Sequence, residues 1–380
     1  MRIGIEAQRI FRAKKHGMDI YVLQLISHLM EVDHTNEYFI FVKPGPDECL
    51  QATKNFHIVK VPGLTYLDWE QVSLPWYTSR YKLDLLHCTS NTAPLLTRIP
   101  LILTLHDIIY LNKGFQGGSW YQRLGHYYRK WVVPMVYHKA KKIITVSNFE
   151  KQTIEEKMGK DERLLVTYNG VHEKFNHQIP VTKLQTVRTR YQLPEQYLFF
   201  LGNTAPKKNM KNLLVAYARY VATQSQALPL VIAESSQEVI NALLQELSLS
   251  HISHKIRLTG YVGHDDLPSI YAMASVFLYP SLRESFGIPI IESMACGTAV
   301  ITSNTSSMPE VAGEAAVLID PVKIEEITKA MQALTMDNDS RISLEKKGLK
   351  RSKTFTWTQT ANSTLQIYQR TLNVWHNITL

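Results

Sequence analysis

The sequence has few cysteines, no long hydrophobic run and no clustered metal ligands. Its 380 residues include three cysteines, Cys49, Cys88 and Cys296, which are too scattered for a disulfide framework or a cysteine metal site, so we expect no metal. No stretch approaches 18 consecutive apolar residues, so we expect no transmembrane span. Met1 leads directly into a predicted strand without a signal-peptide pattern. We therefore predict a cytoplasmic protein.

Positive charge is concentrated in the first half of the chain. Residues 1–190 hold 26 Lys and Arg against 17 Asp and Glu, whereas the second half holds 16 of each. No acidic residue occurs between Asp107 and Glu150. The basic and aromatic residues of that segment are Lys113, Trp120, Tyr121, Arg123, Tyr127, Tyr128, Arg129, Lys130, Trp131, Lys139, Lys141 and Lys142. The segment suits peripheral contact with an anionic membrane or an anionic acceptor. The alternatives are a solvated helix whose aromatic rings face the core, and nucleic acid, which we do not expect as a partner.

Short apolar runs alternate with amphipathic stretches along the whole chain, a pattern typical of parallel α/β layers. The predicted strands are 2–6, 37–42, 56–61, 84–87, 101–105, 142–146, 164–168, 197–202, 229–233, 255–259, 275–279, 299–302 and 316–319. The predicted helices are 17–31, 68–80, 119–139, 147–158, 209–221, 236–247, 265–273, 288–296, 323–334 and 338–351. A polar stretch at 174–194 is predicted to be a linker. We expect two doubly wound units, with ligands at the carboxyl ends of their strands.

The most informative segment is Glu284–Gly297, in which two glutamates lie eight residues apart. Pro289 stands where a first helical turn accepts proline, and Gly287 permits close approach of a ligand to the backbone. A helix start of this kind binds anions such as phosphate. Because carboxylates repel phosphate, we expect Glu284 and Glu292 to accept hydrogen bonds from hydroxyls, one on a sugar and one on a ribose. The alternative is that these residues have no role in binding and are only the Glu, Pro and Gly commonly found near the ends of a helix.

A glycosidase is disfavoured by the spacing of these two carboxyl groups. Glycosidases hold their two carboxyl groups about 5–9.5 Å apart. Eight residues of helix rise about 12 Å. The pair is better placed to straddle a long ligand than to attack one bond.

Further candidates follow other predicted strands. Gly17 follows a basic loop and opens a helix, where it permits approach to a phosphate. His106 ends strand 101–105, where it can bind a substrate or shuttle a proton near neutral pH. Asn169 directly follows strand 164–168, and its main signal is that of a turn residue. Lys207 and Lys208 lie at a helix start, where two cations are unfavourable unless they meet an anion such as a diphosphate.

Several motifs together resemble the large retaining glycosyltransferase family called group 1. They are the E-x7-E element of 284–292, Pro-Lys-Lys-Asn at 206–209 and Ser-Met-Pro-Glu-Val at 307–311. His106-Asp107, Val146-Ser-Asn148 and Asn169-Gly-Val171 match in the first half. The resemblance covers essentially the whole chain. It implies the α/β GT-B fold, two Rossmann-like doubly wound domains facing a central cleft.

The resemblance also implies roles for individual residues. As catalytic residues it indicates His106 at the transferring sugar, Lys208 at the diphosphate and Glu284 at the donor sugar. As substrate-binding residues it indicates Gly17, Asn148, Asn169, Gly202, Lys207, Ser285, Phe286, Gly287, Ile288 and Glu292. Many members have Arg where this chain has Lys207. A compact ammonium group there replaces a planar guanidinium group, which can bind a phosphate through two hydrogen bonds.

We therefore predict an acceptor-binding domain at 1–175, with a terminal helix at 363–380 packing back on it, and a nucleotide-sugar-binding domain at 176–362. The implied reaction moves a hexose, with GDP-mannose as the best-supported donor, to a hydroxyl of a glycan or lipid-linked acceptor in polysaccharide or lipopolysaccharide synthesis. It retains the anomeric configuration and needs no cofactor or metal. A sugar-nucleotide epimerase on the same fold and a catalytically silent sugar-binding partner are the alternatives.

Overall fold

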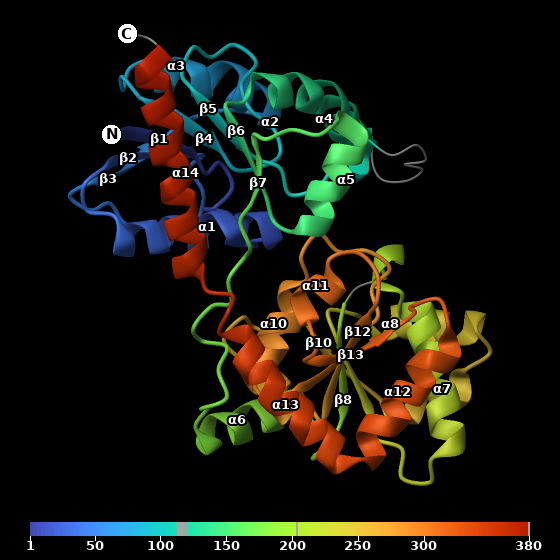
Figure 1. The fold of residues 1–380 in the computed structure, drawn as a ribbon. Coiled ribbons are helices and arrows are strands. Elements are labelled where there is room, and N and C mark those ends of the chain that lie inside the picture. The colour runs from blue at the N-terminus through green and yellow to red at the C-terminus, as the bar shows by residue number, and fades with distance from the viewer. Residues whose placement is uncertain (112–119, 203, 379–380) are drawn as a thin grey trace. The chain divides into compact units, whose positions relative to one another are not determined.

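The computed structural model describes residues 1–111, 120–202 and 204–378, which form two compact units (Figure 1). Unit 1 comprises Met1–Gly170 and Trp357–Leu380, and unit 2 comprises Val171–Thr356. The sequence places these divisions at 175/176 and 362/363, a few residues further along the chain. Each unit is a parallel sheet with its own core.

Unit 1 contains a seven-stranded sheet in the order β3-β2-β1-β4-β5-β6-β7. Its strands are β1 (Arg2–Glu6), β2 (Glu37–Val42), β3 (Phe56–Lys60), β4 (Leu85–Cys88), β5 (Leu101–Thr104), β6 (Lys142–Thr145) and β7 (Leu164–Val166). Its helices are α1 (Gly17–Val32), α2 (Tyr66–Asp68), η1 (Trp69–Ser73), α3 (Leu74–Thr78), η2 (Ile109–Leu111), α4 (Trp120–Lys139), α5 (Asn148–Met158) and α14 (Trp357–Ile378).

Unit 2 contains a six-stranded parallel sheet in the order β10-β9-β8-β11-β12-β13. Its strands are β8 (Leu198–Leu201), β9 (Leu230–Ala233), β10 (Ile256–Gly260), β11 (Val276–Tyr279), β12 (Ala299–Ser303) and β13 (Ala316–Ile319). Its helices are α6 (Val181–Tyr191), η3 (Pro206–Lys208), α7 (Met210–Thr223), α8 (Gln237–Glu246), η4 (Ser250–Lys255), α9 (Leu267–Met273), α10 (Ile288–Ala295), α11 (Met308–Ala312), α12 (Ile324–Met336) and α13 (Asn338–Ser352).

The predicted linker at 174–194 is wrong, because most of it is helix α6. Pro180 stands at its N-cap, where its fixed φ starts the helix rather than breaking it. Val187 is the one residue of α6 that is fully buried. A helix with so few core contacts has the polar composition of a loop, which is why the pattern was misleading.

Alternating side chains give unit 1 a core on both faces of its sheet. In β2, Tyr38, Ile40 and Val42 belong to a cluster that includes residues of α1 and α14. Phe39 and Phe41, which point to the opposite face, pack in a cluster with residues of η1 and α3. Successive residues of a strand face opposite sides, so a strand buried on both sides is apolar throughout.

The terminal helix α14 is joined to unit 1 by a buried polar chain as well as by packing against α1. The Tyr368 hydroxyl lies 2.7 Å from Nδ1 of His87 in β4, and His87 Nε2 lies 2.7 Å from the Thr104 hydroxyl in β5. Burial lowers the pKa of His87 to about 3, so this imidazole is neutral and needs one donor and one acceptor.

We expect Tyr368→Phe to lower the free energy of unfolding by about 1–2 kcal/mol, because it leaves His87 Nδ1 buried without its partner. Urea denaturation measures the change. Gln369→Ala, at an exposed position of the same helix, is the matched control and should change stability by less than about 0.5 kcal/mol. Equal midpoints for Tyr368→Phe and the parent protein would contradict the structural role of this contact.

Candidate functional site

The main candidate site lies in unit 2 where the winding of the sheet reverses. β8 and β11 are neighbours, and the chain proceeds outward from them in opposite directions, toward β10 and toward β13. The loops that follow two such strands diverge and leave room for a ligand. Two contacts fix these loops to each other: Leu282 N donates to Lys207 O over 2.7 Å, and Asn209 Nδ2 donates to Pro280 O over 3.0 Å. Asn209 was not predicted as part of the site.

The structure brings together three predicted site residues, Lys207, Lys208 and Glu284. Lys208 Nζ lies 2.8 Å from Glu284 Oε1, and Lys207 Nζ lies 3.3 Å from Oε2. Lys208 Nζ also donates to the Tyr279 hydroxyl over 3.1 Å and lies above its ring. The side chains of Lys208 and Glu284 are 18% and 10% exposed, whereas Lys207 is 49% exposed. Two ammonium groups thus share one carboxylate, which leaves one positive charge.

Burial and charge act in opposite directions on the pKa values of this pair. Burial lowers the pKa of Lys208, and Glu284 offsets only part of that effect. Burial would raise the pKa of Glu284, but Lys208 and Lys207 outweigh it and lower that pKa. An added anion would stabilise the charged form of Lys208, so the site is suited to bind one.

The start of α10 adjoins this pair and matches the predicted anion site. Gly287 is its N-cap, with a φ of +100° that favours glycine, and Pro289 lies in the first turn. The Ser307 hydroxyl lies 2.8 Å from Glu284 O and 2.9 Å from Phe286 O, so it holds the loop from the side of α11. The first amides of a helix have no partner within it and point out of its N-terminus. Ser285 lies in the loop two residues before Gly287, and Ile288 is the first residue of α10.

Glu292 is the fifth residue of α10 and lies in its second turn. Its partner is also different from that of Glu284: the Tyr271 hydroxyl donates to Glu292 Oε2 over 3.4 Å. Burial raises the pKa of Glu292 to about 7. The structure therefore gives the two glutamates unlike environments, one held ionised by cations and one poised to titrate near neutral pH.

A cavity of about 570 Å³ lies at the carboxyl ends of β8, β9 and β10 in the same unit. Glu234, Ser235 and Tyr261 line it together with Thr204, which follows Gly202 in the loop after β8. These lining residues were missed in the sequence. The signal that could have found them is their position directly after predicted strands, the same rule that identified Lys208.

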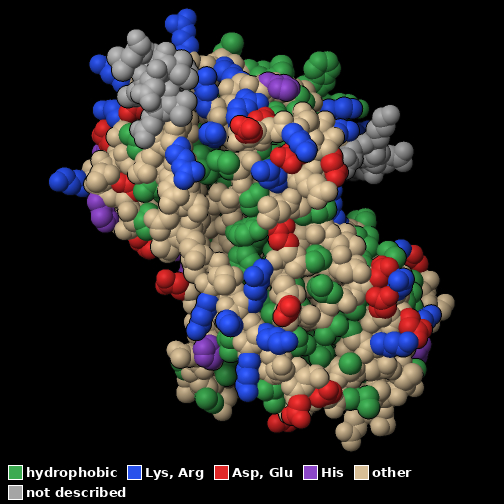
Figure 2. All heavy atoms as spheres, viewed as in Figure 1, with side chains coloured by type: hydrophobic (Ala, Val, Ile, Leu, Met, Phe, Trp, Pro, Cys, Tyr) green, Lys and Arg blue, Asp and Glu red, His purple; other side chains and the backbone are tan. Residues whose placement is uncertain are grey.

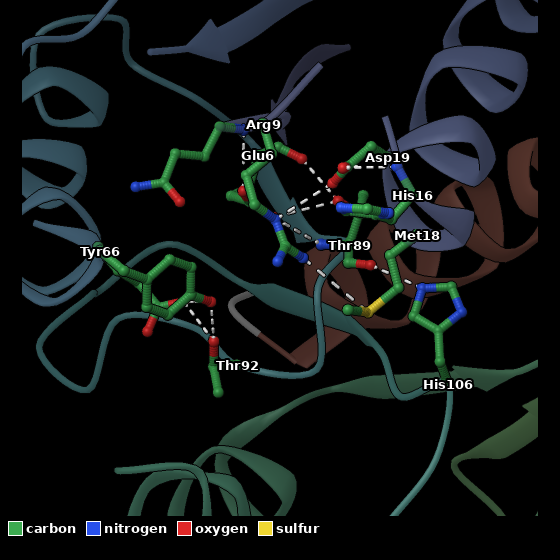
Figure 3. A network of polar contacts seen from close by, with 11 residues as sticks. Glu6, Arg9, His16, Met18, Asp19, Tyr66, Thr89, Thr92 and His106 are labelled. Carbon is green, nitrogen blue, oxygen red and sulfur yellow. Dashed lines mark hydrogen bonds and ion pairs between the residues drawn. The ribbon is translucent and has the colours of Figure 1, made fainter. Parts of the chain in front are cut away.

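In unit 1, His106 follows β5 and is buried beside the loops after β1 and β4 (Figure 3). Its Nε2 lies 2.9 Å from Thr89 O and donates to it, and its backbone amide donates to Asn91 Oδ1 over 2.6 Å. Burial lowers the pKa of His106 to about 4. The ring is therefore neutral near pH 7 in this structure. Both roles predicted for His106, hydrogen bonding to a substrate and proton shuttling, stay predictions.

The other predicted residues of unit 1 begin helices or follow strands. Gly17 is the first residue of α1, and a Cβ added there would meet nothing within 4 Å. Asn148 is the first residue of α5 and its Nδ2 donates to the Tyr168 hydroxyl over 2.7 Å. Asn169 is buried, and its Oδ1 has no hydrogen-bond partner among the described residues.

The basic and aromatic segment lies mainly on α4, and Figure 2 shows Lys and Arg side chains over much of the drawn face of unit 1. Tyr127 and Trp131 are 60% and 73% exposed, whereas Tyr128 is half-buried and donates to Glu70. Lys113 and the side chains of Trp120 and Tyr121 lie outside the described residues. Of the helices described, none combines the length and apolar character needed to cross a membrane.

Two family models match the chain along most of its length. The model "Glycosyl transferases group 1" matches residues 186–351, which hold the Lys208–Glu284 pair, and "Glycosyltransferase Family 4" matches residues 16–175. Both units therefore match glycosyltransferase models, unit 2 the group 1 model and unit 1 the Family 4 model. This confirms the family predicted from the E-x7-E element and its companion motifs.

Two curated relatives from Escherichia coli are mannosyltransferases by name. The O-antigen chain mannosyltransferase B is 32% identical over 232 residues, 60% of this chain and 61% of the relative. The serotype-specific mannosyltransferase WbdA is 29% identical over 242 residues, 62% of this chain and 29% of the relative. The chain thus spans under two thirds of the length of either relative.

The solved structure of Anabaena Alr3699/HepE in complex with UDP has the same fold, with a TM-score of 0.75 at 16% identity. The match covers 97% of this chain and all of that one. The solved structure of the glycosyltransferase WaaG matches with a TM-score of 0.71 at 14% identity, over 96% of this chain and 99% of that one. These neighbours and the two parallel sheets confirm the predicted α/β fold of GT-B type, with two Rossmann-like domains. That the domains face a central cleft stays a prediction.

We expect Glu284→Gln to lower the free energy of unfolding by about 3 kcal/mol, because it leaves the buried Lys208 ammonium without its counter-charge. Urea denaturation followed by far-ultraviolet circular dichroism measures the change. Lys207→Met is the matched control, and since Lys207 is half exposed its loss should cost under about 1 kcal/mol. Inorganic pyrophosphate should restore part of the stability of Glu284→Gln. Equal losses in the two variants would show that the Lys208–Glu284 contact is not the stronger one.

Proposed function

We propose that the protein is a retaining, metal-independent glycosyltransferase that moves a hexose from a nucleotide-diphosphate sugar to a hydroxyl of a glycan or lipid-linked acceptor. The observation that carries this proposal is the Lys208–Glu284 pair beside the start of α10. It offers an ammonium group and helix amides to a diphosphate, and a carboxylate to sugar hydroxyls, within one loop system. Unit 2 is accordingly the donor-binding domain.

The donor extends in both directions from its diphosphate. Glu284 accepts hydrogen bonds from the hydroxyls of the transferred sugar, and Glu292 from those of the ribose. Lys208, Lys207 and the amides around Phe286, Gly287 and Ile288 hold the diphosphate. The cavity lined by Glu234 and Tyr261 receives the nucleobase. Gly202 and Ser285 border the donor. The donor-side roles of Gly17 and His106, and substrate binding by Asn148 and Asn169, stay predictions.

Catalysis depends on stabilising the negative charge that develops on the leaving diphosphate. The acceptor oxygen bonds to the anomeric carbon as the bond from that carbon to the phosphate oxygen breaks, and the diphosphate leaves with the electron pair. Lys208 and the helix amides stabilise this growing negative charge in a partly buried site. The acceptor proton passes to the departing phosphate oxygen, so no carboxylate nucleophile is required. The acceptor approaches from the same face as the departing diphosphate, which retains the configuration.

Mannose is the proposed sugar and GDP-mannose the proposed donor. Both relatives described above are named mannosyltransferases, and the first is named for the O-antigen chain. Transfer in cell-surface polysaccharide or lipopolysaccharide synthesis is the corresponding proposed setting. These relatives are transferases, which favours transfer over the epimerase alternative and over a silent sugar-binding partner.

Unit 1 is the proposed acceptor-binding domain. The exposed Tyr127 and Trp131 of α4, with basic neighbours such as Lys130, support peripheral contact with an anionic membrane at its cytoplasmic face. A lipid-linked acceptor would be reached at such a surface.

We expect Lys208→Ala to lower kcat/KM for transfer by about 100- to 1000-fold while leaving the fold intact, since it removes a charge aimed at the leaving diphosphate. Labelled GDP-mannose and UDP-hexoses with a mannose-terminated acceptor measure transfer, and NMR of the product gives its anomeric configuration. Lys207→Ala is the matched control and should cost under about tenfold. Donor interconversion without transfer would establish the epimerase, and loss of activity with EDTA would contradict metal independence.

We expect donor affinity to weaken as the pH falls below about 7. The pKa of Glu292 is raised to about 7, so the carboxylate that accepts ribose hydroxyls is ionised above this pH and protonated below it. Calorimetric titration of GDP-mannose between pH 6 and 8 measures the dependence. Glu292→Gln cannot titrate and should bind weakly at every pH. A parent protein with a flat profile over this range would remove Glu292 from ribose binding.

A further inference from the structure

A second cavity, of about 520 Å³, lies wholly within unit 1. The residues that line it include Arg9 after β1, Tyr66 after β3 and Asn91 after β4. β1 and β4 are neighbours from which the chain proceeds outward in opposite directions, so this cavity occupies the switch point of the first sheet. The proposed donor site does not include it.

Three guanidinium groups line this cavity, those of Arg9, Arg12 and Arg129. Arg9 Nε pairs with Asp19 Oδ1 at 3.2 Å (Figure 3). Arg12 is exposed, and Arg129 Nε is buried with no hydrogen-bond partner among the described residues. Of the described residues that line the cavity, none is acidic. The wall therefore carries an excess of positive charge, and one of its donors is unsatisfied.

The aromatic walls of the cavity are held by a buried carboxylate. The Tyr66 hydroxyl donates to Glu70 Oε1 over 2.8 Å, and the Tyr128 hydroxyl donates to Oε2. The Thr92 hydroxyl also donates to Oε1, over 2.5 Å, and Gln71 Nε2 donates to Oε2 over 3.0 Å. The two tyrosine rings stand edge to face, with centroids 6.0 Å apart. Such anchoring fixes their faces before a ligand arrives, which lowers the entropy cost of binding.

Asn91 links the cavity to His106. Its φ of +69° is unusual for a residue other than glycine. This conformation puts its Oδ1 within 2.6 Å of the His106 amide, while the residue itself lines the cavity. Strained backbone of this kind is found at ligand-binding positions.

We propose that this cavity binds a phosphate-bearing saccharide, with the phosphate held by Arg12 and Arg129 and a sugar ring against Tyr66 and Tyr128. Arginine is the residue that best matches phosphate, through paired N–H donors. Tyrosine faces suit the apolar side of a sugar ring and also present a polar edge. The inference rests on the proposed function, since it makes this saccharide the acceptor, joined either to a free phosphate or to a polyprenyl phosphate.

The test compares two mannosides that differ in the substituent on the anomeric carbon, a charged phosphate in one and a neutral methoxy group in the other. Mannose 1-phosphate and methyl α-mannoside are titrated by calorimetry into the full chain, its Arg12→Ala and Arg129→Ala variants, and Lys208→Ala. We expect the parent protein to bind mannose 1-phosphate about tenfold or more tightly than the neutral glycoside. Each arginine variant should lose most of that preference, whereas Lys208→Ala should keep it. Lys130→Ala, an exposed cation on the same helix as Arg129, is the matched control.

Equal affinity for the two probes, or no measurable binding of either, would overturn the proposal. A preference lost in Lys208→Ala but kept in the arginine variants would do the same, because the phosphate would then occupy the donor site. A farnesyl mannosyl phosphate in detergent distinguishes the sources: tighter binding than mannose 1-phosphate indicates the lipid-linked form, and equal binding the free one. If the arginine variants lose the preference but the parent protein transfers no sugar, the proposed function fails and the anion site stands.

Discussion

The constraint on which the rest of the structure depends is the reversal of chain order within each parallel sheet. A strand in a parallel sheet ends at the same edge as its neighbours, so the loops after β8 and β11 must leave that edge side by side. Their chains then continue outward in opposite directions, and this divergence makes space for a ligand. The Lys208–Glu284 pair exists because one partner follows β8 and the other follows β11. In unit 1 the same reversal, between β1 and β4, brings Arg9 and Asn91 to one cavity.

The side chains at the two switch points both carry an excess of positive charge, although the cations are lysines in unit 2 and arginines in unit 1. In unit 2, two lysines share one glutamate, and burial lowers the pKa of Lys208. In unit 1, three arginines line a cavity, and within the described part of the chain only Arg9 of these three has a carboxylate partner, Asp19. Each site is thus short of negative charge. A buried cation without full compensation costs stability, so each arrangement is most easily explained by a ligand that supplies the missing anion.

The sequence predicts most of the fold because its strands are buried on both faces and therefore apolar throughout. It fails at α6, where a helix with almost no buried residues resembles a loop. It predicts Lys208 and Glu284 because both stand beside strand ends and carry motifs of a known family. It does not predict Asn209 or Ser307 as supports of the site, since their role lies in contacts to backbone oxygens more than twenty residues away. Such contacts follow from tertiary packing and leave no local pattern.

His106 and Glu292 show why residue type alone cannot assign a role. A histidine has an ordinary pKa near neutrality, yet burial lowers that of His106 to about 4, against the opposing effect of its hydrogen bond to Thr89. A glutamate is ordinarily ionised at neutral pH, yet burial brings Glu292 to about 7. Near pH 7 the histidine is therefore neutral, and the glutamate is the one of the two whose charge changes. Because desolvation depends on the assembled core, this exchange of behaviour becomes visible only when the folded chain is known.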